Sequence, residues 1–190
     1  DGEIISYGIM PMVVVLDGNT LSEEPYMGHP ATDPIDVGAN VIRFPLQTGI
    51  SLDYQVEANQ LKQNLVVREA PNLLDHQKES GYFGISETMV LPSGFALFLG
   101  ESPIADGELV KTNQSLSIRN LDTGAQLVSI PQPTVSSADP EAEVGDTHIG
   151  FYVIRVEGTT ITFTTVVENT WLMDEDNRSF PILIDPTLDK

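Results

Sequence analysis

Two short groups of oxygen-bearing side chains are the residues of this sequence whose types and spacing could bind a metal ion. They are Asp174, Asp176 and Asn177 in one group, and Asp139, Glu141, Glu143 and Asp146 in the other. Carboxylate and amide oxygens at this density are ligands that calcium prefers, although an EF-hand would also need a Gly at the sixth and a Glu at the twelfth loop position. Calcium is therefore the one metal that these side chains predict. The alternative is a solvated polar turn and a solvated acidic loop that bind nothing.

No other arrangement of side chains predicts catalysis. The three histidines form neither an HxH nor an HExxH spacing, and the chain has no cysteine. A GxSxG motif, a P-loop and a GxGxxG motif are also missing from the sequence. Among 28 acidic residues, nothing distinguishes a pair of carboxylates for acid–base chemistry. We therefore assign no catalytic residue, and we expect neither enzyme activity nor a required cofactor.

Two features are typical of proteins that carry or contact glycans. Asn113 and Asn177 each begin an Asn-X-Ser sequon for N-glycosylation. Trp171, the single tryptophan, and Phe180 are expected to close one end of the core, and the alternative is a stacking platform for a sugar. Glycans are therefore one class of partner to consider.

The charge balance narrows the classes of partner further. The chain of 190 residues has 28 acidic against nine basic side chains, and its net charge is −19. The basic residues are scattered singly, so no basic stripe is available to bind nucleic acid or an anionic membrane. The longest apolar stretch is too short for a membrane-spanning helix. The chain starts with Asp1 rather than Met, which favours a mature exported protein or an excised domain in an extracellular location.

Alternating apolar and polar residues predict that β-strands carry these side chains. Residues 51–57 and 61–69 form two such runs joined by a short turn, and residues 149–167 form a second clear hairpin. Only residues 73–79 are expected to form a short helix. About ten strands at a spacing of about 8–12 residues predict an all-β fold. We expect a β-sandwich of roughly ten mostly antiparallel strands, of jelly-roll or immunoglobulin-like type.

The N-terminal segment, residues 1–16, is expected to be a separate apolar strand, followed by a single sandwich domain over residues 17–190. Its strand-forming side chains are Ile4, Ile5, Tyr7, Ile9, Met12, Val13, Val14, Val15 and Leu16. An open sheet edge can accept such a strand from a neighbouring subunit, so the segment is a candidate donor strand. The alternative is a strand buried in its own sheet. A true donor strand predicts that removal of residues 1–16 abolishes assembly and leaves a folded monomer.

Two stretches of the sequence resemble one recurring module. Residues 49–69 read GISLDYQVEANQLKQNLVVRE, and residues 171–187 read WLMDEDNRSFPILIDPT. Together they resemble the β-rich extracellular region of large prokaryotic surface and secreted proteins, of the kind that precedes YD-repeat (Rhs-type) arrays. The matching positions are Asp53, Tyr54, Lys62, Arg178, Pro181, Ile184, Asp185 and Pro186. The resemblance implies an extracellular, non-catalytic β domain that is often one segment of a longer chain.

These observations predict a structural protein of the cell surface. We expect a subunit of a filament, sheath or layer that binds copies of itself through β-strand edge pairing. The alternative is a glycan- or protein-binding module of a larger secreted protein or adhesin. The first hypothesis predicts polymers, whereas the second predicts a monomer with an exposed aromatic patch.

Overall fold

The structure is a computed structural model, and it describes residues 6–7, 12–26, 33–38, 40–47, 49–57, 60–137, 147–174 and 179–185. The strands are β1 (Ser6–Tyr7), β2 (Met12–Leu16), β3 (Glu23–Pro25), β4 (Ile35–Gly38), β5 (Val41–Gln47), β6 (Ile50–Glu57), β7 (Gln60–Val67), β8 (Tyr82–Val90), β9 (Phe95–Leu99), β10 (Ser102–Pro103), β11 (Leu109–Thr112), β12 (Leu116–Asn120), β13 (Gln126–Ile130), β14 (Thr134–Ser137), β15 (His148–Ile149), β16 (Phe151–Glu157), β17 (Thr160–Glu168) and β18 (Ile182–Asp185). The two short helices are α1 (Asp75–Glu79) and α2 (Asn169–Leu172). Within the described ranges, neither helix has the length or apolar character needed to cross a membrane.

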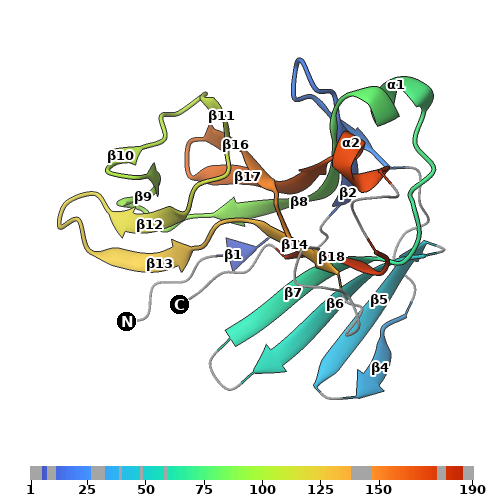
Figure 1. The fold of residues 1–190 in the computed structure, drawn as a ribbon. Coiled ribbons are helices and arrows are strands. Elements are labelled where there is room, and N and C mark those ends of the chain that lie inside the picture. The colour runs from blue at the N-terminus through green and yellow to red at the C-terminus, as the bar shows by residue number, and fades with distance from the viewer. Residues whose placement is uncertain are drawn as a thin grey trace.

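The strands form three sheets (Figure 1). Sheet A has the order β11-β16-β17-β8-β2-β3, with β1 also beside β8; sheet B has the order β15-β14-β18-β7-β6-β5-β4; and sheet C has the order β10-β9-β12-β13. All strand pairs in the described part of the chain are antiparallel. The prediction of an all-β, mostly antiparallel fold is therefore confirmed. Strands outnumber the expected ten because some, such as the two-residue β10 and β15, are too short to show alternation in the sequence.

Sheet A is the layer that the other two sheets share. One face of it packs against sheet B in core I, which consists of Val15, Ile50, Leu52, Leu65, Val67, Leu73, Phe83, Ile85, Val135, Val167, Leu172, Ile182 and Ile184. Further along the same strands it packs against sheet C in core II, which consists of Met89, Leu91, Leu97, Ile104, Leu116, Ile118, Val128, Ile130, Tyr152, Ile154, Val156, Ile161 and Phe163. The long strands β8 and β17 enter both cores and connect the two ends of the molecule (Figure 1).

The opposite face of sheet A has a smaller core, and the sheet curls around it. Core III consists of Val14, Leu16, Val153 and Val166. On this face Thr164 of β17 donates a hydrogen bond to Glu23 of β3, and Lys111 of β11 donates to Tyr82 of β8. β17 and β3 are three strand spacings apart in the order of sheet A, and so are β11 and β8, at about 4.8 Å per spacing. A flat sheet would hold these side chains out of reach, so sheet A is curled.

Gly84 permits a close approach of β8 and β17 within this curl. A Cβ atom at Gly84 would lie 1.9 Å from the carbonyl oxygen of Thr165. Any side chain would therefore push the two strands apart. Gly84 is opposite Val14 on one side and Val166 on the other, and its missing side chain leaves room for these two valines in core III.

The hairpins expected from alternation are present. β6 pairs with β7 up to Glu57 opposite Gln60, and β16 pairs with β17 up to Glu157 opposite Thr160. The predicted helix is α1, while the one-turn helix α2 was not expected. β2 forms a hairpin with β3 across the boundary expected after Leu16, so both sides of that boundary contribute to sheet A.

Candidate functional site

The N-terminal segment supplies an internal strand of sheet A. β2 lies between β8 and β3 and pairs with both. Its side chains alternate between two cores, with Val15 in core I and Val14 and Leu16 in core III. Their exposed fractions are 4%, 0% and 1%, respectively. In this structure the strand therefore pairs within its own chain.

The other candidate donor residues are less central. Val13 packs against core I, Met12 is exposed at the start of β2, and Tyr7 of β1 is opposite Met89 of β8. Three candidates lie outside the described residues: Ile4, Ile5 and Ile9. This geometry argues against the expectation that a chain without residues 1–16 stays folded, because three core side chains would leave with the segment.

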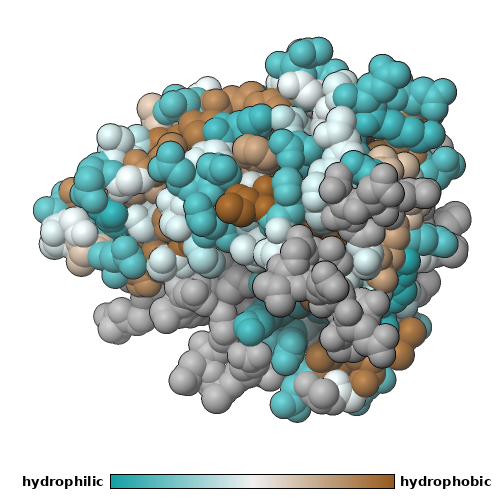
Figure 2. All heavy atoms as spheres, viewed as in Figure 1, coloured by the Kyte–Doolittle hydropathy of each residue, from teal (hydrophilic) through white to brown (hydrophobic). Residues whose placement is uncertain are grey.

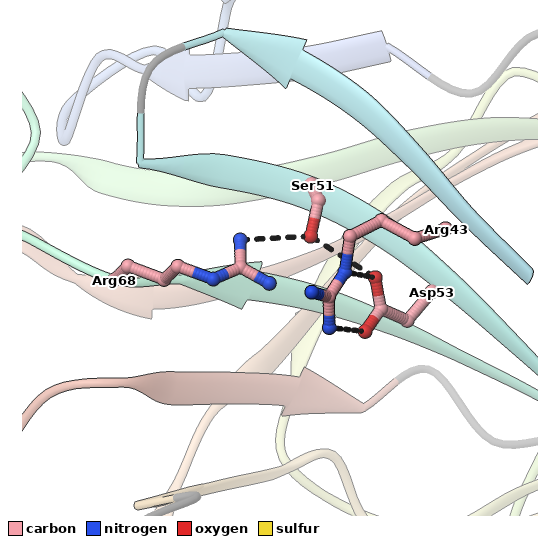
Figure 3. Close-up of polar contacts among 4 residues, drawn as sticks. All are labelled: Arg43, Ser51, Asp53 and Arg68. Atoms are coloured by element: carbon pink, nitrogen blue, oxygen red, sulfur yellow. Dashed lines mark hydrogen bonds and ion pairs between the residues drawn. The ribbon is translucent and has the colours of Figure 1, made fainter. Parts of the chain in front are cut away.

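A network of polar side chains joins β5 and β6 to the end of β7 (Figure 3). Arg43 donates from Nε to Oδ1 of Asp53 at 2.8 Å and from Nη2 to Oδ2 at 2.6 Å. Ser51 Oγ donates to Oδ1 of Asp53 at 3.0 Å and accepts from Nη1 of Arg68 at 3.0 Å. Ser51 and Asp53 are buried, on the face of sheet B opposite to Leu52 of core I.

This network contains two guanidinium groups and one carboxylate. Its hydrogen bonds to Asp53 raise the pKa of Arg43, whereas burial and the charge of Arg43 lower the pKa of Arg68. Both Asp53 oxygens accept hydrogen bonds from Arg43, and Oδ1 also accepts one from Ser51. The arrangement therefore cross-links β5 and β6 to the end of β7.

The structure brings together the two stretches that carry the sequence resemblance. β18 pairs with β7, and β7 pairs with β6, which holds Asp53 and Tyr54. Tyr54 packs edge-to-face on Phe44, with ring centroids 5.6 Å apart. Ile184 of β18 enters core I. Two matching positions lie outside the described residues: Arg178 and Pro186.

An acidic side chain that sequence reasoning missed is held at the junction of the three sheets. Glu87 of β8 lies on the same face of sheet A as Ile85 of core I and Met89 of core II. Gln63 of β7 donates from Nε2 to Oε1 of Glu87 at 2.6 Å. Burial raises the pKa of Glu87, and the hydrogen bond from Gln63 opposes that shift. Burial and the charge of Glu87 together raise the pKa of Tyr54 to about 12.

Replacing Glu87 with glutamine is expected to stabilise the protein at neutral pH. The pKa of Glu87 is higher in the folded state than in the unfolded state. The contribution of Glu87 to the free energy of unfolding is therefore fully present below the unfolded-state pKa and is lost as the pH rises through the folded-state pKa. Glutamine stays uncharged, and its carbonyl oxygen can still accept from Gln63. The gain at pH 7 should be on the order of 1 kcal/mol and should vanish in acid.

Denaturant melts of the Glu87→Gln variant and the wild type at several pH values measure this gain. Glu101→Gln is the matched control, because the Glu101 side chain is 90% exposed. Equal pH dependence of the two variants would contradict the prediction.

Sheet B ends in an edge strand with exposed apolar side chains. Ile35 and Val37 of β4 and Ile42 of β5 are all exposed. Figure 2 shows apolar surface at the lower right, where Figure 1 places β4. A bulge between Asp36 and Gly38 interrupts the register with β5. Because bulged edges resist pairing with a further strand, we assign no assembly role to this patch.

Most residues predicted to bind calcium lie outside the described part of the chain. Asp174, which follows α2, is described, and the others are not: Asp176, Asn177, Asp139, Glu141, Glu143 and Asp146. The described residues contain no group of three or more His, Asp or Glu side chains placed to hold a metal ion. Calcium binding therefore stays a prediction. Of the two glycosylation candidates, Asn113 is exposed and Asn177 is outside the described residues.

Trp171 is part of the packing of the molecule. It packs against core I, as does Phe180, and its ring stacks on His148 with centroids 4.7 Å apart. Nε2 of His148 lies 3.0 Å from Oε2 of Glu168. One face of the Trp171 ring is therefore covered, which favours the core-closing role over a platform for sugars.

The chain matches no family model, no curated protein and no solved structure. Among the described features of the molecule, the position of β2 bears most directly on assembly.

Proposed function

We propose that this protein is a non-catalytic, extracellular structural subunit that assembles with copies of itself by exchanging its N-terminal strand. The observation that carries the proposal is the position of β2, an apolar strand that completes two cores. β1 and β2 come before β3 in the chain, and the β2–β3 connection leads from them to the other strands. The slot between β8 and β3 can accept β2 from a neighbouring copy with the same hydrogen bonds and apolar contacts.

Four of the edge strands, β3, β4, β10 and β11, support exchange over simple edge-to-edge pairing. Pro25 lies in β3 and Pro103 in β10, Lys111 lies in β11, and β4 has the bulge between Asp36 and Gly38. Prolines, lysines and bulges prevent an edge from pairing with another sheet. An apolar strand that enters an internal slot avoids these obstacles.

The charge of the chain supports an assembly that depends on a specific contact. A net charge of −19 keeps separate copies apart and well hydrated. Non-specific association is therefore disfavoured, whereas burial of β2 in the slot of a neighbour restores contacts that each copy needs to fold. Burial of β2 in a neighbouring copy and the sequence resemblance together favour an extracellular filament, sheath or layer.

A disulfide between β2 and β8 distinguishes exchange from pairing within one chain. The chain has no cysteine, and Met12 is directly opposite Ser86, at a spacing that suits a disulfide. After concentration and oxidation, the double variant Met12→Cys, Ser86→Cys is expected to give covalent multimers on a non-reducing gel. Covalent monomers alone would overturn the proposal.

A matched control tests the gel assay itself. The double variant Glu157→Cys, Thr160→Cys joins β16 to β17 across a hairpin, where the two residues are opposite each other. It should give covalent monomers at any protein concentration. Light scattering of the wild type with calcium and with chelator then shows whether the acidic groups contribute to the assembly.

A further inference from the structure

A groove on the curled face of sheet A is lined by two opposite charges that do not pair with each other. Its volume is about 280 Å³, and the β2–β3 hairpin lines it together with β11, β16 and β17. Leu21, Leu109 and Val153 line it with apolar atoms. Glu23 and Arg155 contribute the charges, and no ion pair in the described ranges joins them.

The carboxylate of Glu23 is fixed in position by neutral hydroxyl groups. Ser86 Oγ donates to its two oxygens at 2.9 and 3.1 Å, and Thr164 Oγ1 also donates to it. Both donors are buried, and their hydroxyl oxygens lie 3.0 Å apart. Within the described part of the chain no cation forms an ion pair with Glu23. Its negative charge is therefore oriented and available to a positive group of a ligand.

The guanidinium of Arg155 differs from those of the three other arginines in the described residues. Arg43, Arg68 and Arg119 all donate to side-chain oxygens. Arg155 is exposed, and in the described residues it makes neither a side-chain hydrogen bond nor an ion pair, although acids outnumber bases by 28 to nine. Five N–H donors in a planar fork suit a carboxylate, which they can bind in a bidentate manner.

We propose that this groove binds a small zwitterion, an α-amino acid with an apolar side chain. The α-carboxylate pairs with Arg155, the α-ammonium pairs with Glu23, and the side chain lies against Leu21, Leu109 and Val153. A ligand with one charge only would leave the other charge of the groove unmatched. The volume is just below the range of about 300–1,000 Å³ that is usual for small-molecule pockets, which fits a single amino acid rather than a peptide.

Isothermal titration calorimetry of the full chain with L-leucine tests the proposal. We expect binding to the wild type, and we expect Arg155→Gln to weaken it by about 10–100-fold, since a charge-assisted hydrogen bond is lost. Glu23→Gln should weaken it similarly, while its amide oxygen can still accept from Ser86 and Thr164. Two analogues separate the charges on the unchanged protein: 4-methylpentanoate lacks the ammonium group, and 3-methylbutylamine lacks the carboxylate.

The matched control is Arg119→Gln, which removes an equal charge from sheet C, away from the groove. It should bind L-leucine like the wild type. No binding of L-leucine, equal binding to Arg155→Gln, or equal binding of either analogue would each overturn the proposal. The result is independent of strand exchange, because it is measured on the folded chain at low concentration.

Discussion

A chain that lacks residues 1–16 is expected not to fold by itself. The truncation removes Val14, Val15 and Leu16, which are buried in two cores. Burial of three such side chains contributes together roughly 5–9 kcal/mol. That is comparable with the whole stability of a typical domain, about 5–15 kcal/mol. Truncation also leaves the facing backbone groups of β8 and β3 without partners. Circular dichroism and the binding of a dye to exposed apolar surface measure the loss.

A peptide of residues 1–16 is expected to restore the fold of the truncated chain when it is added in equimolar amount. The slot that β2 leaves is defined on one side by β8 and on the other by β3, and a strand from a separate molecule can make the same contacts. The matched control is the same peptide with Val14→Asp and Leu16→Asp, which places charges in core III. A peptide that restores nothing would contradict strand exchange. A truncated chain that folds alone would contradict the expected loss of stability, because three buried side chains of two cores would then be dispensable.

Alternation in the sequence predicts the local hairpins, because period-two patterns reflect which side chains are buried on one face. It does not predict which sheet a strand joins. Residues 149–156 read as one strand, yet Ile149 belongs to β15 of sheet B and β16 belongs to sheet A. Gly150 separates them, and a Cβ atom there would lie 2.5 Å from the carbonyl oxygen of Val166. That contact is non-local, so a pattern of neighbouring residues cannot indicate it.

The contacts of polar side chains are likewise only partly predictable from the sequence. Glu87 has a sequence signal, because it is an acidic residue on the apolar side of the run from Phe83 to Met89. Its partner Gln63 has none, since the contact depends on how sheets A and B pack. Glu23 and Arg155 meet in one groove only because sheet A is curled, and curl depends on contacts between strands that are distant in the chain. The motif that holds Asp53 is visible in the sequence as a resemblance, whereas the bond of Asp53 to Arg43 follows from strand register.

Asp53→Ala is expected to lower the free energy of unfolding by about 2–3 kcal/mol. The substitution removes the acceptor of Arg43 and Ser51 and leaves two guanidinium groups near one buried hydroxyl. The side chain of Asp53 is 10% exposed and that of Arg43 is 31% exposed. Water can therefore solvate part of the freed guanidinium, which places the expected loss below that of a fully buried pair. Urea melts of the variant and the wild type measure the difference.

A double-mutant cycle separates the pair itself from the cost of an uncompensated charge. Arg43→Ala, Asp53→Ala and their combination should give a coupling energy of about 1–2 kcal/mol, because the pair is bidentate and mostly shielded from water. The matched control is the cycle on Arg119 and Glu101, joined by one 3.1 Å contact to a carboxylate that is 90% exposed. Its coupling should be about 0–1 kcal/mol. Equal coupling in the two cycles would contradict the prediction, because burial would then add nothing to the attraction between Arg43 and Asp53.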